Sequence, residues 1–218
     1  GERKVTYIEN IFICRAIPLV LSLLFIRDRV RTFTLFVTIG MGICLLSAYI
    51  SSFFMRTYGI DAALAAIEIT PVCEEIMKLL PLLLYFWIFE PKAERLPAAA
   101  IAVAVGFATF ENVCYLTENG AEIFSFLLIR GISAGALLLL CGICIGGGIS
   151  YVFRRRWLAL TGTVGLLGAC IAFHAIYNLL VTAEGVWRMV GYFFPSLMIV
   201  CLFIARQFLP KVREILDL

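Results

Sequence analysis

The sequence predicts an all-α fold, a polytopic bundle of about seven transmembrane helices that forms a single membrane-embedded domain over residues 1–218. Of the 218 residues, 62% are hydrophobic and only 15% are charged, and the mean hydropathy is +1.01. A soluble domain carries about 25% charged residues. Apolar runs of about 20 residues, the length of a membrane-crossing helix, recur along the chain. No alternating strand pattern is visible, which favours helices over a barrel.

Seven apolar segments reach or approach the length that crosses a bilayer. They lie at residues 8–26, 33–55, 69–89, 98–117, 123–152, 157–181 and 190–208. The first is the weakest because Arg15 interrupts it, and the fifth is long enough to include an interfacial turn before Arg130. In the third, Pro71 suits the first turn of a helix. Close helix packing is expected at six small residues, namely Gly131, Gly135, Gly142, Gly146, Gly165 and Gly168.

The basic residues of the loops predict the orientation of the bundle, because cytoplasmic loops carry an excess of Lys and Arg. With seven spans, the side of the N-terminus holds four of them: Arg3, Lys4, Arg56 and Arg188. The opposite side holds eleven: Arg27, Arg29, Arg31, Lys92, Arg95, Arg154, Arg155, Arg156, Arg206, Lys211 and Arg213. We therefore expect a multi-pass protein of the cell membrane with its N-terminus outside and its C-terminus in the cytoplasm.

Ionisable side chains from four of the predicted helices fall at one depth in this topology. Glu74 and Glu75 lie about five residues below the outer face, while Glu111, Arg130 and His174 lie about seven residues from it. At 1.5 Å per residue this places them roughly 8–10 Å below the outer boundary. An ionised group near the bilayer centre costs on the order of 2.5–3.5 kcal/mol, and somewhat less near its edge. We therefore expect these side chains to face one another across a wet cavity.

The spacing of further polar residues supports one shared cavity. Glu74 and Lys78 are four residues apart, as are His174 and Asn178, so each pair shares a helix face. Lys78 is expected to hold the two carboxylates of the third helix in position. Asn178 can donate a hydrogen bond to a developing oxyanion.

Two kinds of hydrolytic chemistry are open to such a layer. Histidine and carboxylates can hold a metal ion that activates a bound water, with a second glutamate as general base. Alternatively, a buried glutamate can activate water directly. Either route describes hydrolysis of an amide bond within the membrane. The residue types alone do not choose between them.

Several features also have plainer interpretations. Glu74 and Glu75 could be an acidic helix start whose side chains extend to the surface. Glu111 and Asn112 could form a hydrogen-bonding pair between helices. The CxxC of residues 141–144 is expected to pack in a helix, because no second pair completes a zinc site. A small proton-coupled carrier also uses intramembrane carboxylates, although no inverted repeat is visible.

Three motifs resemble the signatures of the PrsW family of intramembrane proteases, which is similar in outline to the CAAX prenyl proteases. They are CEEIMK at 73–78, GFATFENVCY at 106–115 and HAIYN at 174–178, in the family's order and with similar spacing. The resemblance covers most of the chain. By motif matching, Glu74, Glu75 and His174 take the essential positions and Glu111 the acid of the second motif. The resemblance implies an endopeptidase that cuts a single-span membrane protein, such as an anti-sigma factor, near its extracytoplasmic end.

The resemblance also implies a divalent metal, with zinc as the first candidate and His174 and Glu111 as its ligands. Arg130, Lys78 and Asn178 would position the substrate or its oxyanion. The expected partners are the lipid bilayer and the single-span substrate, and no nucleic acid. One departure is that Leu138 stands where the family usually has a second histidine, and another is that Asn178 replaces the commoner acid. These changes keep open a catalytically silent relative that binds transmembrane helices.

Overall fold

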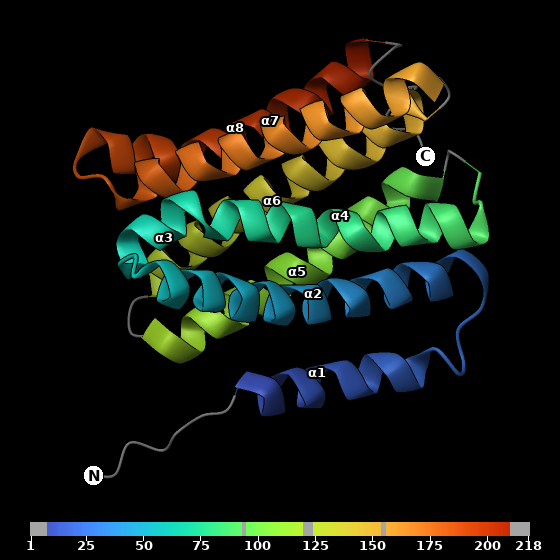
Figure 1. Ribbon diagram of the computed structural model, residues 1–218, viewed down its shortest axis with the longest axis horizontal. Coiled ribbons are helices and arrows are strands. Elements are labelled where there is room, and N and C mark those ends of the chain that lie inside the picture. The colour runs from blue at the N-terminus through green and yellow to red at the C-terminus, as the bar shows by residue number, and fades with distance from the viewer. Residues whose placement is uncertain (1–7, 93–94, 120–123, 154–155, 210–218) are drawn as a thin grey trace.

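The structure is a computed structural model that describes residues 8–92, 95–119, 124–153 and 156–209, and within these ranges it contains eight helices and no strand. The helices are α1 (Ile8–Ser22), α2 (Asp28–Tyr58), α3 (Ala62–Glu68), α4 (Thr70–Phe89), α5 (Leu96–Asn119), α6 (Phe124–Val152), α7 (Arg156–Thr182) and α8 (Val186–Phe208). Figure 1 shows the long helices lying side by side, with each running opposite to the one before it. The expected all-helical bundle is therefore confirmed for the described residues.

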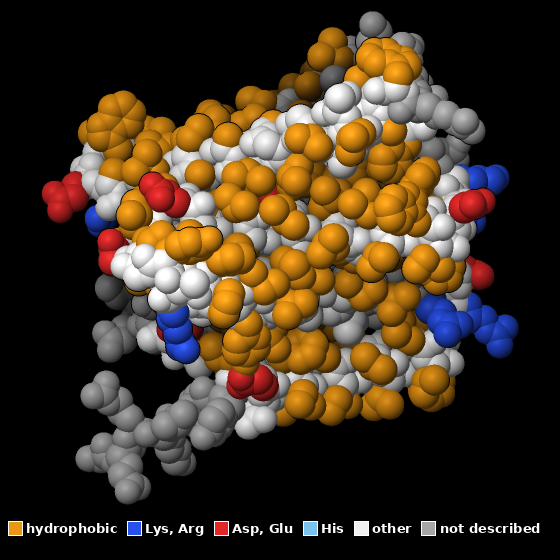
Figure 2. All heavy atoms as spheres, viewed as in Figure 1, with side chains coloured by type: hydrophobic (Ala, Val, Ile, Leu, Met, Phe, Trp, Pro, Cys, Tyr) orange, Lys and Arg blue, Asp and Glu red, His pale blue; other side chains and the backbone are white. Residues whose placement is uncertain are grey.

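Five helices of the described chain are long and apolar enough to cross a membrane: α2, α5, α6, α7 and α8. The protein is therefore a multi-pass membrane protein. In Figure 2, charged side chains gather toward the two ends of the bundle and apolar side chains cover the face between them. Helices α1 and α4 lie alongside these five (Figure 1), but α1 has only 15 residues and α4 carries three charges near its start. The count of seven spans stays a prediction, as does the orientation. Six of the basic residues counted for the orientation lie outside the described residues: Arg3, Lys4, Arg154, Arg155, Lys211 and Arg213.

The tightest contact in the bundle joins α2 and α5 through two glycines. A Cβ atom added to Gly40 of α2 would overlap the carbonyl oxygen of Val103, and one added to Gly106 of α5 would overlap the carbonyl oxygen of Val37. Backbones can approach this closely only where neither residue has a side chain. Neither glycine was among those expected from the sequence to allow close packing.

The six glycines that were expected to allow close packing behave differently from one another. Gly142 and Gly146 of α6 pack against α5, since a Cβ on either would lie 2.7 Å from the Cβ of Ala104 or Ala100. Those two were predicted correctly. A Cβ at Gly131 would make only an ordinary contact, with Asn112 at 3.7 Å. The expectation was wrong for Gly135, Gly165 and Gly168, because a Cβ there would have no described neighbour within 4 Å.

A short helix, α3, precedes α4 and was not predicted. Helix α2 ends at Gly59, whose φ of +64° is a left-handed conformation that glycine adopts without strain. Two residues later, the side chain of Asp61 caps α3 by accepting hydrogen bonds from the backbone N–H groups of Ala63 and Leu64, at 2.9 and 3.0 Å. The glycine, the aspartate and the alanine-rich AALAAIE that follows are the sequence signals that could have predicted it.

Both cysteines of the CxxC were expected to pack, but only Cys141 is buried, against α7, whereas Cys144 is exposed. The thiol of Cys141 lies 4.0 Å from the carbonyl oxygen of Cys170, whose own thiol lies 3.7 Å from the carbonyl oxygen of Cys141. All eight cysteines of the sequence are free thiols.

Candidate active site

The first half of α4 places three ionisable side chains in the interior of the bundle. Glu74, Glu75 and Lys78 are 9%, 0% and 5% exposed. The ammonium of Lys78 donates a hydrogen bond of 2.7 Å to Oε1 of Glu75 and lies 5.0 Å from the ring centroid of Phe107 on α5. Lys78 was expected to share a face with Glu74, four residues before it. Its partner is instead Glu75, three residues before it, which lies on nearly the same face of the helix.

His174 of α7 lies between the two carboxylates. Its Nδ1 is 2.8 Å from Oε1 of Glu75, and its Nε2 is 3.7 Å from Oε2 of Glu74. Because an ionised carboxylate only accepts hydrogen bonds, Nδ1 carries the hydrogen in the first contact. In the neutral ring Nε2 is then an acceptor, and it faces Glu74. Oε2 of Glu74 has no hydrogen-bond partner among the described residues.

A cavity of about 320 Å³ opens beside His174. It is bounded by residues of α3, α5, α6, α7 and α8, and four of the side chains singled out in the sequence line it: Glu111, Arg130, His174 and Asn178. Leu138, which stands where the resemblance led us to expect a second histidine, lines the same cavity. Glu74 and Glu75, which were expected to face the same cavity, do not line it and are linked to it through His174.

Arg130 of α6 is fixed to α5 by three contacts. Its Nη1 donates to Oδ1 of Asn112 at 2.7 Å, and its Nη2 donates to Oε1 of Glu111 at 3.0 Å. The guanidinium carbon lies 3.7 Å from the ring centroid of Tyr115. Glu111 and Asn112 therefore do join two helices, as the plainer interpretation proposed, and they do so through Arg130.

Asn178 of α7 is held by the backbone of the unpredicted helix α3. Its Nδ2 donates a hydrogen bond of 2.8 Å to the carbonyl oxygen of Ala66. Since a carbonyl only accepts, this contact identifies the nitrogen end of the amide. An amide group has two N–H donors, so one of them is left for a group in the cavity that Asn178 lines.

The cavity also contains residues that were not singled out from the sequence, among them Tyr177, Tyr192 and Ala66. Tyr177, adjacent to Asn178, shares a buried hydrogen bond of 3.1 Å with Ser133, whose hydroxyl donates to it. Tyr192 of α8 and Ala66 of α3 also line the cavity. Tyr177 lies three residues after His174, close to the same helix face, and that spacing could have identified it.

The metal implied by the resemblance can be tested against the donor atoms of the site. Among the described residues, no group of three or more His, Cys, Asp and Glu side chains is arranged to hold an ion. Glu111 is paired with Arg130, and Nδ1 of His174 is bound to Glu75. This leaves Nε2 of His174 and Oε2 of Glu74, which lie 3.7 Å apart, and Oε2 of Glu75, a residue that lines a different pocket with Lys78. A catalytic zinc takes three protein ligands. The described donor set does not fit zinc, and the assignment of His174 and Glu111 as metal ligands stays a prediction.

The sequence was compared with known protein families, with curated proteins and with solved structures. The profile described as "PrsW family intramembrane metalloprotease" matches residues 28–205, which is most of the chain. GDP-fucose transporter 1 of the mouse, Mus musculus, is 32% identical over 111 residues, a match that covers 41% of this chain and 31% of that protein. The chain thus spans less than a third of that relative, whose name says nothing about the site described here. No solved structure matches the chain. The chain belongs to the PrsW family of intramembrane proteases.

Proposed function

We propose that this protein is an endopeptidase that hydrolyses a peptide bond of a single-span membrane protein near its extracytoplasmic end. The observation that carries the proposal is His174, held by Glu75 on one side and facing Glu74 on the other at the wall of the cavity. A general base and an oriented imidazole beside a cavity are what water activation requires. Family membership supports the same reaction class.

We propose Glu74 as the general base. The substrate water would donate one hydrogen bond to Oε2 of Glu74 and one to Nε2 of His174, two atoms that lie 3.7 Å apart. Glu74 would take the proton as the water oxygen bonds to the scissile carbonyl carbon. It would then return that proton to the leaving amine nitrogen as the carbon–nitrogen bond breaks. Each carboxylate of α4 then has its own role, because Glu75 orients the histidine.

The other polar residues would bind and position the substrate. The second N–H of Asn178 would stabilise the oxyanion of the tetrahedral intermediate, as preorganised donors do in other acyl-transfer sites. Arg130, fixed by Glu111 and Asn112, would set the width of the cavity on the α5–α6 side. Lys78 acts through Glu75 and is a positioning residue.

The place of cleavage along the substrate follows from the expected orientation. The site lies toward the first residues of α4 and α6 and the last residues of α5 and α7, which meet at one end of the bundle (Figure 1). The basic-residue count assigns that end to the outside. A single-span helix bound alongside would therefore present its extracytoplasmic end to the cavity.

The test is cleavage of a panel of single-span membrane proteins by the purified protein in lipid, with product ends read by mass spectrometry. Glu74→Gln keeps the size of the side chain and removes the base, so we expect a loss of about 10²–10⁴-fold. Glu68→Gln, an exposed glutamate of α3, is the matched control and should retain activity.

Wild-type rates in Glu74→Gln would refute the assigned base. If no substrate were cut under any metal condition, the protein would instead be a silent relative that binds transmembrane helices.

A further inference from the structure

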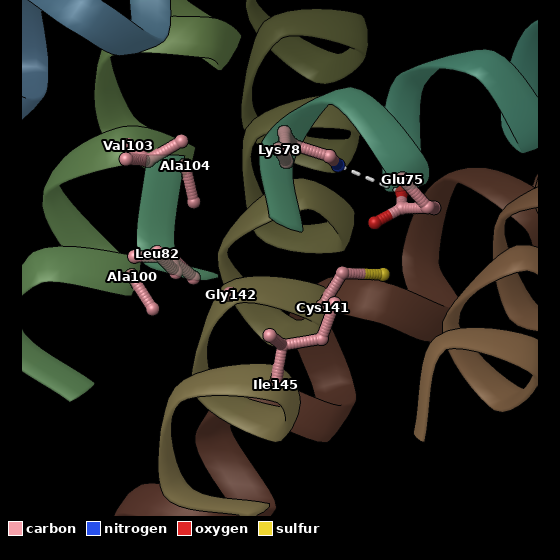
Figure 3. A pocket seen from close by; sticks show the side chains of 9 residues that line it. All are labelled: Glu75, Lys78, Leu82, Ala100, Val103, Ala104, Cys141, Gly142 and Ile145. Carbon is pink, nitrogen blue, oxygen red and sulfur yellow. Dashed lines mark hydrogen bonds and ion pairs between the residues drawn. The ribbon is translucent and has the colours of Figure 1, made fainter. Parts of the chain in front are cut away.

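A second and much smaller cavity, of about 10 Å³, lies between α4, α5 and α6 (Figure 3). Its lining is apolar except for Glu75, Lys78 and Cys141. The mechanism proposed above uses only one oxygen of Glu75 and makes no use of this space. What the cavity holds is therefore a separate question.

The second oxygen of Glu75 marks the cavity as a polar site. Oε1 accepts hydrogen bonds from Lys78 and His174. Oε2 is buried and has no hydrogen-bond partner among the described residues, although Glu75 is 0% exposed. In Figure 3 this oxygen points away from the Lys78 bond, into the space between Lys78 and Cys141. A buried carboxylate oxygen without a hydrogen bond costs free energy, so a partner is expected there.

Lys78 offers the matching donor. An ammonium has three N–H groups, and the hydrogen bond to Oε1 of Glu75 uses one of them. Its Nζ lies above the ring of Phe107, and Lys78 also lines the cavity. The thiol of Cys141, which points toward Glu75 in Figure 3, adds a weak third partner.

We propose that this cavity is a binding site for one water molecule. The water would donate a hydrogen bond to Oε2 of Glu75, accept one from Nζ of Lys78 and contact Sγ of Cys141. A volume of about 10–15 Å³ on this measure is the least that holds one water, and buried waters have two to four polar partners. A metal cation would meet the ammonium and only one carboxylate oxygen, which is too few ligands. The inference does not depend on the proteolytic activity.

The direct test is a high-resolution experimental structure of the wild-type protein in lipid. We expect a density peak within hydrogen-bond distance, about 2.6–3.2 Å, of both Oε2 of Glu75 and Nζ of Lys78. A cavity without density would overturn the proposal. Lys78 bonded directly to both oxygens of Glu75, with the space closed, would overturn it as well.

A matched pair of substitutions gives a second test. Ala104 lines the cavity, and Ala104→Thr and Ala104→Val add side chains of the same shape, of which only threonine carries a hydroxyl. Either side chain would displace a water molecule from the cavity. Only the threonine hydroxyl can replace the hydrogen bonds that the water made. We expect Ala104→Thr to unfold at a temperature at least about 2 °C above that of Ala104→Val. An apolar empty cavity would favour valine, so equal midpoints or a higher midpoint for Ala104→Val would refute the proposal.

Discussion

Lys78 and Glu75 form an ion pair that is almost completely buried, with side chains 6% and 0% exposed. Such a pair differs from one on the surface, because removing one partner leaves an uncompensated charge in the interior. The carboxylate of Glu75 also holds His174. Replacing the lysine is therefore expected to destabilise the protein, although Lys78 does not touch the proposed substrate water.

We predict that Lys78→Met lowers the thermal unfolding midpoint in detergent by about 6–20 °C, which corresponds to about 3–5 kcal/mol for a broken buried pair. The double variant Lys78→Met/Glu75→Gln should recover much of this loss, because it removes both charges. Lys92→Met, at an exposed position, is the control. A midpoint that Lys78→Met leaves unchanged would contradict the structural role assigned to the pair.

The metal question can also be decided at the level of single residues. Because the described donors do not fit zinc, we predict that wild-type protein stripped by chelators, and shown by elemental analysis to be metal-free, still cleaves its substrate. Activity that chelators abolish and zinc restores would contradict this.

Leu138→His places an imidazole at the wall of the cavity that His174 lines. With Oε2 of Glu74 this would complete three ligands, so the variant should bind zinc in elemental analysis more tightly than wild type. Equal zinc contents of the two proteins would show that position 138 does not reach the site.

Residue types and spacing predicted only part of how the intramembrane charges meet. Glu74 and Glu75 contact His174, and Glu111 contacts Arg130, but the cavity that His174 shares with Glu111 and Arg130 is lined by neither Glu74 nor Glu75. Helical spacing could not decide whether Lys78 pairs with Glu74 or Glu75, since both lie on its side of α4. That choice depends on His174, which approaches from a helix far along the chain.

At the level of elements, the contact between α2 and α5 depends on Gly40 and Gly106. Any side chain at either position would overlap a backbone carbonyl of the other helix. The end of a flexible side chain can move to relieve such an overlap, but a carbonyl group in a helix backbone cannot. The two helices must therefore separate if either glycine is replaced.

We predict that Gly106→Ala lowers the thermal midpoint by about 2–12 °C, the range expected for overpacking. Gly135→Ala is the matched control, because a Cβ there meets no described atom within 4 Å. Alanine also favours a helix over glycine by about 1 kcal/mol, so Gly135→Ala should be neutral or stabilising. Equal losses in the two variants would show that propensity, and not close packing, governs both positions.

Helices were easier to predict than their contacts. The segment expected at 33–55 is a longer helix, Asp28–Tyr58, while 69–89 and 98–117 differ from α4 and α5 by no more than two residues at either end. Apolar runs define such segments well. Which glycines face a neighbour depends on how each helix is rotated in the bundle, and hydropathy does not report that rotation in helices that are apolar on all sides.

At the level of the whole molecule, the orientation in the membrane is the prediction on which the position of cleavage depends. In a cysteine-free background, we predict that Glu118→Cys reacts with an impermeant maleimide from the outside and that Lys92→Cys reacts only from the cytoplasmic side. Both residues are exposed and lie near opposite ends of α5. The reverse pattern would invert the bundle and move the expected cleavage to the cytoplasmic end of the substrate.

The pairing of Glu75 with His174 also has a consequence for biosynthesis. The two residues are 99 positions apart, so at about 5–20 residues per second the ribosome makes the histidine roughly 5–20 s after the glutamate. In the predicted topology, α4 would enter the bilayer with its carboxylates during that interval, and Lys78, only three residues away, is already present to neutralise Glu75. The lysine that holds Glu75 in the finished site would thus also be the counter-charge of α4 before α7 is made.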